Sequence, residues 1–429
     1  MLKFFNLKEK NTDFKTEVVA GITTFMTMAY ILVVNPSILS ETGMNFGAVF
    51  TATALASILA TGLMGLYARL PFAQAPGMGL NAFFAYTIVI SMGYSWRFAL
   101  TAVFLEGIIF ILLTIFNLRE AIIDSIPLNI KKAISVGIGL FIAFIGLESA
   151  AIVINPESGT ILQLGNIIEG QALLAIIGII VTGILLAKNI KGALLIGIII
   201  TTLLGVPLGI TELPQRLVSL PPSIEPIFLK FEWHRIISID MLIILFTLLF
   251  MDMFDTVGTL VGVATKAKML DENGKVPRAK KALLADAIGT TAGACFGTST
   301  VSTYVESAAG VAEGGRTGLT ALTTSAMFVL ALFLSPIFIM IPSPATAPAL
   351  IMVGLFMMEP IKEINLEDYT EAIPAFFTII MMPLSYSISD GIVFGIVSYV
   401  ILKVFTGQKD EVSLATYIVG ILFIIKFFI

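Results

Sequence analysis

Four acidic side chains lie inside apolar stretches of this chain, where ionisable residues are rare. Asp252 and Asp255 stand three residues apart among leucine, phenylalanine and methionine, so on a helix they would share one face. Asp286 and Glu306 lie in two later stretches rich in alanine and other small residues. A carboxylate at the centre of a membrane-spanning helix costs about 2.5–3.5 kcal/mol even on a lenient scale. We therefore expect these acids to face a polar cavity, to pair with one another, or to be protonated.

The acids also have a blander interpretation. They could form a buried hydrogen-bonded network that binds no ligand, and Asp286 alone could serve only to orient its neighbours. Glu106 lies in another apolar run and has no partner that the sequence reveals. A structural role, or a place at the rim of a cavity, is the better interpretation of Glu106.

An amide and two aromatic rings follow a stretch rich in proline and glycine, residues 70–79. Such a stretch predicts a break in the chain and a short helix that begins after it, with Asn81 just inside. The Asn81 side chain offers both a donor and an acceptor, which suits the edge of a heterocycle. Phe83 or Phe84 could stack on a flat ring; contact with lipid or core is the alternative for each.

A second short segment, residues 302–313, follows a stretch of hydroxyl-bearing residues that begins at Thr298. Such residues cap helices, and the helix N-terminus beyond them presents free N–H groups and a positive dipole end. That dipole end would favour the ionised form of Glu306.

Several kinds of chemistry are excluded by what the sequence lacks. It contains no G-x-x-x-x-G-K-[ST] motif, so the chain is not expected to hydrolyse ATP. His234 is the only histidine and stands in an aromatic, charged loop, and Cys295 is the only cysteine. No intramolecular disulfide can form, and an intramembrane zinc enzyme is improbable. We expect no metal, no cofactor and no enzymatic activity.

The elements that hold these residues must lie in lipid. Of 429 residues, 57% are hydrophobic and only 13% charged, with a mean hydropathy of +0.99, whereas a soluble domain has about 25% charged residues. A chain this apolar would aggregate in water, so we predict a multi-pass protein of the cell membrane. The net charge of −4, without a long basic tail, gives no indication of nucleic-acid binding.

Fifteen apolar runs follow one another along the chain, against a nominal fourteen transmembrane segments. One of the last three is expected to be short, re-entrant or interfacial. The first run continues through Asn35 and Pro36 without a cleavage pattern, which indicates a retained helix rather than a signal peptide. The runs lie at 17–38, 47–67, 78–92, 97–116, 131–149, 171–187, 192–208, 239–262, 281–296, 302–313, 317–340, 346–359, 371–388, 390–406 and 412–428.

Lysine and arginine alternate between loops in the way that the positive-inside rule requires. The loops at 149–170 and 335–346 have none, and only 209–238 departs from the rule, since it is predicted outside yet holds Arg216, Lys230 and Arg235. The basic positions predicted to be cytoplasmic are Lys3, Lys8, Lys10, Lys15, Arg119, Lys131, Lys132, Lys188, Lys191, Lys266, Lys268, Lys275, Arg278, Lys280, Lys281, Arg316 and Lys362. This pattern predicts a cytoplasmic N-terminus.

Seven runs in each half is an odd number, so the two halves would have opposite orientations in the membrane. Such an inverted repeat is the architecture of many secondary transporters. The two short, interrupted segments, at 78–92 and 302–313, occupy corresponding positions in the two halves. Broken helices in that arrangement point to a binding site near the middle of the bilayer.

These residues resemble the nucleobase–cation symporter family 2, in its AzgA-like purine permease branch. The resemblance extends over essentially the whole chain and is strongest at 21–36, 74–84, 252–259 and 302–310. It implies seven-plus-seven inverted repeats, in which helices 3 and 10 are half-helices, each preceded by a short strand. The implied domains are a core of residues 1–120 and 236–342 and a gate of residues 121–235 and 343–429.

The resemblance also implies a site and an activity. Asn81, Asp252 and Glu306 match the substrate-binding positions of the family, with Asp255 and Asp286 as supporting acids. Uracil and xanthine relatives carry a glutamate on helix 8 where this chain has the aspartate pair, which disfavours those substrates. Relatives work as homodimers with an elevator-type movement of the core, driven by protons or, in some branches, by sodium.

We therefore expect an importer of adenine, guanine and hypoxanthine that is coupled to protons rather than sodium. A carboxyl group of Asp252 or Glu306 would take up a proton, since burial favours its neutral form, and would then hydrogen-bond the base. An anion carrier of the sulfate-permease type shares the fold, but acids at the site would repel anions. Three further hypotheses are a sodium-coupled nucleobase carrier, a channel and an intramembrane enzyme.

Overall fold

The computed structural model describes residues 4–116, 127–156, 162–270 and 276–426. The predicted cytoplasmic residues Lys3, Arg119 and Lys275 lie outside these ranges. Within them, eight helices are long and apolar enough to cross a membrane, and four shorter apolar helices accompany them. The all-helical, multi-pass architecture predicted from the sequence is confirmed; the number of crossings stays a prediction.

The first half of the chain folds mostly into helices, with three short strands between them. Its elements are α1 (Phe14–Met28), α2 (Ile31–Ser40), α3 (Phe46–Leu63), η2 (Met64–Ala68), β1 (Gln74–Pro76), α4 (Met78–Ala82), η3 (Phe83–Ser91), α5 (Trp96–Ile115), α7 (Leu128–Ser149), β2 (Val153–Ile154), β3 (Gln163–Leu164), α8 (Gly170–Ala187) and α9 (Ala193–Gly205). Polar caps fix several starts: the backbone N–H of Thr16, for example, donates to the Asp13 carboxylate at 2.9 Å.

The second half is also mostly helical, and its described residues include one short strand. Its elements are α10 (Ile239–Lys266), α11 (Ala279–Phe296), β4 (Val301–Thr303), α12 (Ser307–Ala312), α13 (Gly318–Phe333), α14 (Ser335–Ile339), α15 (Ser343–Met357), η4 (Glu359–Glu363), α16 (Tyr369–Leu384), α17 (Ile388–Phe405), η5 (Lys409–Glu411) and α18 (Leu414–Lys426). The last apolar run of the sequence forms α18, which packs against α17.

The two halves are related as an inverted repeat. Strand β1 pairs antiparallel with β4, in the register Gln74 with Thr303 and Pro76 with Val301. Thr61 of α3 hydrogen-bonds both backbone groups of Gln74, and Thr290 of α11 does the same for Val301. Equivalent helices also make equivalent contacts: α1 packs on α13 as α10 packs on α5, and α7 packs on α16 as α15 packs on α8.

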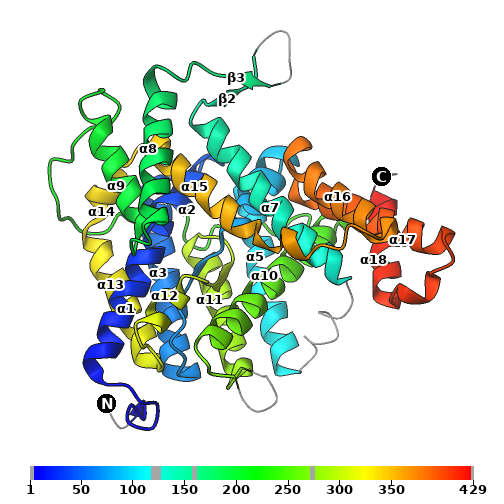
Figure 1. Ribbon diagram of the computed structural model, residues 1–429, viewed down its shortest axis with the longest axis horizontal. Coiled ribbons are helices and arrows are strands. Elements are labelled where there is room, and N and C mark those ends of the chain that lie inside the picture. The colour runs from blue at the N-terminus through cyan, green and yellow to red at the C-terminus, as the bar shows by residue number, and fades with distance from the viewer. Residues whose placement is uncertain (1–3, 117–126, 157–161, 271–275, 427–429) are drawn as a thin grey trace.

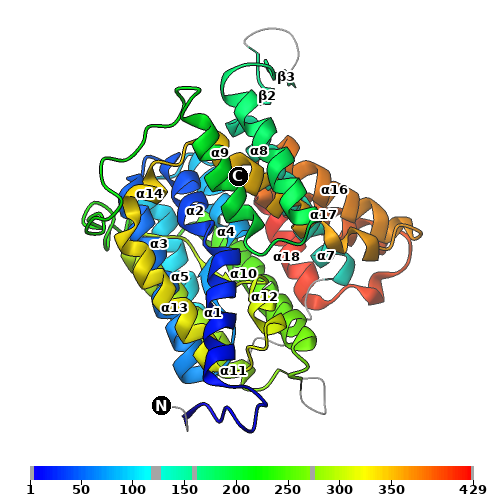
Figure 2. The same ribbon diagram turned by 60° about the vertical axis from the view of Figure 1, so that its left-hand side comes forward.

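The helices gather in two groups. Figures 1 and 2 show α3 and α13 on one side of the molecule and α16 and α17 on the other. The N-terminus lies at one end of the molecule in Figure 1, and the hairpin of β2 and β3 lies at the opposite end. That separation agrees with the lysine and arginine pattern, which predicts opposite sides of the membrane for these two segments.

Helices α7 and α15 cross at a pair of glycines. A Cβ added to Gly139 would lie 2.5 Å from the carbonyl oxygen of Gly354, and one added to Gly354 would meet the carbonyl oxygen of Gly139. Neither backbone oxygen can turn away as a flexible side chain could. The two backbones can therefore approach this closely only because both positions lack a side chain.

We expect Gly139→Ala to destabilise the folded protein by about 1–3 kcal/mol, the usual cost of overpacking a tight interface. Gly183→Ala in α8 is the matched control, because its nearest neighbour is the Met352 Cε at 4.0 Å. Thermal unfolding in detergent should show a lower midpoint for Gly139→Ala and an unchanged or higher one for the control. Equal midpoints would mean that the crossing can widen without loss.

Candidate functional site

The two interrupted segments start from a common point. The ladder between β1 and β4 is extended at its ends, where Gly77 N donates to Thr300 O at 2.9 Å and Tyr304 N donates to Ala73 O at 3.0 Å. The Tyr304 hydroxyl donates to the carbonyl oxygen of Pro76 at 2.6 Å. Helix α4 leaves this junction directly after Gly77, and α12 leaves it after Glu306. The predicted pair of half-helices, each preceded by a strand, is therefore present.

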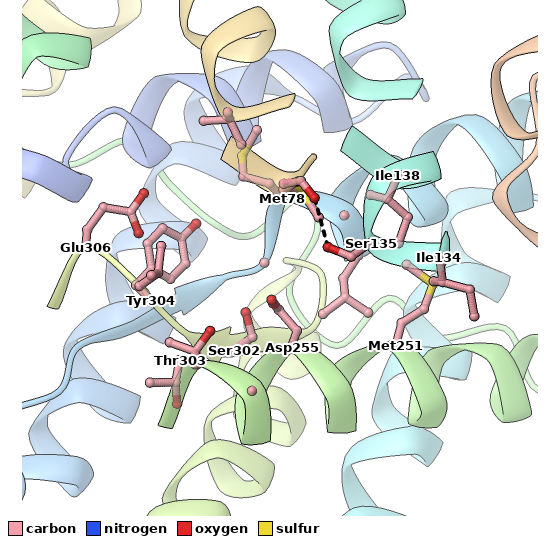
Figure 3. A pocket seen from close by; sticks show the side chains of 18 of the residues that line it. Met78, Ile134, Ser135, Ile138, Met251, Asp255, Ser302, Thr303, Tyr304 and Glu306 are labelled. Carbon is pink, nitrogen blue, oxygen red and sulfur yellow. Dashed lines mark hydrogen bonds between the residues drawn. The ribbon is translucent and has the colours of Figure 1, made fainter. Parts of the chain in front are cut away.

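A cavity of about 290 Å³ adjoins this junction. Figure 3 shows Asp255, Ser302, Thr303, Tyr304 and Glu306 toward one side of it and Ile134, Ser135 and Ile138 toward the other, with Met78 between them and Met251 on the same helix as Asp255. Further lining residues are Tyr30, Gly77, Gly79, Leu80, Lys131, Phe250, Gly258, Thr259, Val305, Val353 and Met357. The walls thus come from α10, α4 and residues 302–306, which precede α12, together with α7 and α15. A mostly apolar wall with a few polar groups is typical of small-molecule sites.

Gly77 allows the end of β1, β4 and α10 to approach one another closely at the cavity. A Cβ added there would lie 2.6 Å from the Ser302 Oγ and 3.3 Å from an Asp255 carboxylate oxygen. Asp255 and Ser302 point into the cavity side by side in Figure 3. Because any larger residue would push these groups apart, glycine keeps the Asp255 carboxylate beside the start of the first half-helix.

Glu306 lies at the cavity wall and immediately before α12, rather than inside a helix as the apolar run 302–313 suggested. That run comprises the end of β4, a turn and a helix of six residues. The Tyr30 hydroxyl donates to the Glu306 carboxylate at 2.6 Å, and Tyr30 itself is buried. Tyr30 ties the first helical segment of the chain to this acid.

Asn81 is fully buried behind the cavity and is not one of its lining residues. Ser299 donates its hydroxyl hydrogen to the Asn81 Oδ1 at 2.5 Å. The Asn81 Nδ2 has no hydrogen-bond partner among the described residues. Its two N–H groups are therefore buried donors that a ligand could satisfy. Asn35 supports this arrangement, since its Nδ2 donates to the Thr298 hydroxyl at 2.8 Å.

Asp252 faces a different environment from Asp255, although both project from α10. Asp252 is fully buried, and the Thr256 hydroxyl lies 3.2 Å from its carboxylate and 3.0 Å from that of Asp286. Gln74 donates to Asp286 at 3.0 Å. Asp252 and Asp286 therefore belong to one hydrogen-bonded network behind the strand pair, while Asp255 lines the cavity.

Phe83 and Phe84 lie in the hydrophobic core at 0% exposure, in the π-helical segment η3. Neither ring lines the cavity in this structure. Of the two interpretations of these rings, stacking on a ligand or contact with lipid or core, the packing agrees with contact with the core. Stacking of either ring on a ligand stays a prediction.

Sequence reasoning missed the aromatic and hydroxyl groups that surround the acids. Tyr30 and Tyr304 were not singled out, although a tyrosine inside an apolar run needs a hydrogen-bond partner and so marks a polar contact. Ser135 and Met357 belong to the opposite wall, where the Ser135 hydroxyl donates to the Met357 carbonyl oxygen at 3.0 Å (Figure 3). No local pattern could have identified these residues, because the contact joins two distant helices.

Residues 15–394 match the family model Xan_ur_permease, whose description is Permease family. A relative named as the putative permease MJ0326 of Methanocaldococcus jannaschii is 51% identical over 425 residues, which cover 99% of this chain and 97% of the relative. The guanine/hypoxanthine permease PbuG of Bacillus subtilis is 46% identical over 438 residues, covering 100% of this chain and 99% of the relative. The adenine permease AdeP of Escherichia coli is 43% identical over 425 residues, covering 99% and 95%.

Solved structures share the fold at much lower sequence identity. The transmembrane domain of the cyanobacterial bicarbonate transporter BicA superposes with a TM-score of 0.65 at 16% identity, covering 89% of this chain and 97% of that domain. The murine anion transporter Slc26a9, in an inward-facing state, gives a TM-score of 0.61 at 12% identity, covering 91% and 68%. The inverted-repeat architecture is common to all three.

Proposed function

The chain belongs to the Permease family, that of the nucleobase–cation symporters of family 2, and we propose that it imports purine nucleobases by secondary active transport. The full-length relatives named as adenine and guanine/hypoxanthine permeases support this substrate class. The observation that carries the proposal is the cavity at the junction of the two half-helices. Its mostly apolar walls and its acids, Asp255 and Glu306, suit a flat, neutral ring that carries hydrogen-bond donors.

The proposed coupling ion is the proton. Glu306 touches the cavity and Asp252 lies behind it, so both can respond to a bound base. A carboxyl group of this pair takes up a proton together with the base, and the loaded carrier then crosses without a net buried charge. Coupling requires that only the fully loaded and the empty forms reorient. Sodium coupling is the alternative for this step.

The proposed movement is of the elevator type. Residues 1–120 and 236–342 form the core that carries the base, and residues 121–235 and 343–429 form the gate. In support, the cavity lies between core elements and the gate helices α7 and α15. With the N-terminus in the cytoplasm, Lys131 and Met357 mark the cytoplasmic side of the cavity, so this conformation would be inward-facing. A homodimer is part of the same proposal.

An anion carrier is the rival that the fold alone permits, since BicA and Slc26a9 are both named as transporters of anions. Their identity to this chain is 16% and 12%, so they bear on the fold and not on the substrate. Asp255 and Glu306 at the cavity wall argue against it, because two carboxylates repel an anion at close range.

Uptake of radiolabelled bases into proteoliposomes tests the proposal. We expect hypoxanthine, guanine or adenine to accumulate when the outside is made acidic, and the other purines to compete. Sulfate and bicarbonate should neither be transported nor compete. Purine uptake that requires sodium and ignores pH would replace the proton by sodium, and absence of any purine uptake would refute the assignment.

We expect Asn81→Ala to weaken purine binding by about 1–3 kcal/mol, the loss for one buried hydrogen-bond partner. The reason is that the Asn81 Nδ2 holds donors which the described residues do not satisfy. Calorimetric titration of the purified variant with hypoxanthine and guanine measures this loss.

Asn35→Ala is the matched control, because it removes another buried amide from the same polar cluster. Asn35 donates to Thr53 and Thr298, and both of these bonds stay within the protein. If Asn81 acted only by holding Ser299 in position, Asn81→Ala and Asn35→Ala would lower the affinity for purines equally. A loss confined to Asn81→Ala supports direct contact with the base.

A further inference from the structure

Glu106 is a buried acid to which the proposed mechanism gives no role. It lies on α5, inside a helix of 20 residues that is apolar enough to span the membrane, and it is 0% exposed. The sequence suggested a structural residue or a cavity rim. In the structure Glu106 is not one of the cavity-lining residues, and its carboxylate accepts a hydrogen bond from Thr300, beside the junction of the half-helices.

Only one oxygen of Glu106 is hydrogen-bonded within the described residues. The Thr300 hydroxyl donates to Oε2 at 2.6 Å, while Oε1 has no partner. Thr300 immediately precedes β4, and its carbonyl oxygen accepts the Gly77 N–H that opens the first half-helix. One threonine therefore joins Glu106 to both halves of the binding junction.

Two further buried acids lie on the helices that pack against α5. Asp252 lies on α10, which packs against α5. Phe110, four residues after Glu106 on α5, packs in one cluster with Met253, the chain neighbour of Asp252. Asp286, on the adjacent α11, is joined to Asp252 through the Thr256 hydroxyl. In the described parts of the chain, Glu106 forms no ion pair with a lysine, arginine or histidine, and these acids form no metal-binding group.

Two neighbouring carboxylates in a dry site cannot both be ionised at moderate cost, because burial disfavours each charge and the charges repel one another. One proton shared between them removes the repulsion, and the protonated oxygen becomes a donor. The Oε1 of Glu106 can carry this shared proton, because no described residue hydrogen-bonds to it. A fully ionised pair would leave this oxygen buried as an unsatisfied acceptor.

We propose that Glu106 and Asp252 together form the site that binds the transported proton. The inference rests on the proposed function and deepens it, because it separates the proton site from the base site. The step is simple in chemical terms: one carboxylate oxygen of the pair gains a proton from hydronium before the base binds, and gives that proton to water on the other side after the base has left. No other bond forms or breaks.

The Thr300 contact explains how the two sites communicate. When Glu106 is ionised, its carboxylate holds the Thr300 hydroxyl strongly, since hydrogen bonds to charged groups are the stronger ones. Protonation of Glu106 weakens this hydrogen bond and so shifts Ser299 and β4, which flank Thr300 in the chain. Glu306, at the cavity wall, is then the acceptor for the base rather than the carrier of the proton.

Infrared difference spectroscopy of the purified protein without substrate tests the proton site directly. We expect the wild type to show a C=O stretch from a protonated carboxylic acid at neutral pH, and Glu106→Gln to lose that band or to shift it. Glu148→Gln, at the exposed end of α7, is the matched control and should leave the band unchanged. An identical band in wild type and Glu106→Gln would overturn the proposal.

Transport by Glu106→Gln gives a second, independent readout. A gradient of one pH unit supports up to about tenfold accumulation of base in a carrier that moves one proton. We expect the variant to accumulate none, while exchange of base for base stays within about threefold of wild type. Glu106→Asp, which keeps an acid, should retain part of the accumulation and shows that the fold tolerates change here.

The outcomes separate this inference from the function on which it rests. Proton-driven accumulation by Glu106→Gln at the wild-type level would refute the proton site and leave the purine carrier intact. Equal loss of exchange and accumulation, with a lower unfolding midpoint, would make Glu106 structural and also refute it. A wild-type protein that exchanges no purine would refute the proposed function itself.

Discussion

Glu306→Gln and Asp252→Asn are each expected to abolish purine accumulation driven by a proton gradient, whereas base-for-base exchange should survive in only one of the two. Each amide has nearly the shape of the acid it replaces and can still hydrogen-bond, but it cannot take up and release a proton. Accumulation needs that proton, while exchange needs only a loaded carrier. The variant that still exchanges identifies the proton site.

The structure favours Asp252→Asn as the variant that still exchanges. Asp252 is buried in a network of protein groups, so its replacement leaves the cavity wall unchanged. Glu306 lines the cavity and accepts from Tyr30, so Glu306→Gln alters a group that a base would touch. Loss of one hydrogen bond to a charged group is worth about 1.5–3 kcal/mol, enough to weaken exchange at low base concentration.

Accumulation and exchange are measured in the same proteoliposomes, with and without a pH gradient. Asp13→Asn, at the cap of α1 and far from the junction, is a suitable control and should behave as wild type in both assays. A gradient that still drives accumulation in both variants would defeat the assignment of these two acids. An anion carrier would behave in the opposite sense, with tighter anion binding once the acids are neutral.

The positions of the half-helices could be predicted because the chain marks them chemically. Proline and glycine before Asn81, and hydroxyl residues before Glu306, interrupt runs that lipid would otherwise make continuous. Acids within apolar runs are equally visible, since lipid tolerates few of them. The fold class followed from composition and from the alternation of basic loops.

The direction in which each acid points could not be predicted. Asp252 and Asp255 share a helical face by spacing, yet one joins a buried network and the other lines the cavity. The difference arises from which element packs on each residue, and that depends on contacts between the two halves. Likewise, the cavity wall on α7 repeats at intervals of three and four residues, as a lipid-facing or core-facing stripe also would.

Helix capping between the two halves was also hidden from the sequence. Glu17, in the first turn of α1, is fully buried and accepts from the backbone N–H groups of Arg316, Thr317 and Thr320. It thereby caps the start of α13, which lies about three hundred residues further along the chain. Sequence rules search for a cap next to its own helix, and so they miss a cap supplied by another one.

The inverted repeat has a counterpart of this contact. Asp240 occupies the first turn of α10 and accepts a hydrogen bond from the hydroxyl of Tyr94, which precedes α5. Burial and the hydrogen bond to Asp240 raise the pKa of Tyr94 to about 12, so this hydroxyl stays a donor throughout the physiological range. Each half therefore uses an acid on its own first long helix to fix the start of a helix in the other half.

We expect Glu17→Ala to lower the free energy of unfolding by about 3 kcal/mol or more, because several buried N–H donors would lose a charged acceptor at once. The Thr320 hydroxyl, which donates to the same carboxylate at 2.6 Å, would also lose its partner. Glu9→Ala is the control, since Glu9 is exposed and accepts from the side chain of Asn6 at the surface. Thermal unfolding in detergent, followed by intrinsic fluorescence, measures both variants.

Glu17→Ala should also affect the binding site. Helix α1 leads directly to Tyr30, which holds Glu306 at the cavity wall, and its packing on α13 sets its position. If Glu17 fixes that packing, Glu17→Ala will weaken base binding as well as the fold, and Glu9→Ala will affect neither. Normal binding together with a lower unfolding midpoint would show that the cap stabilises α13 without positioning Tyr30. An unchanged midpoint would show that water replaces the carboxylate at the start of α13, and that the contact between the two halves depends on apolar packing alone.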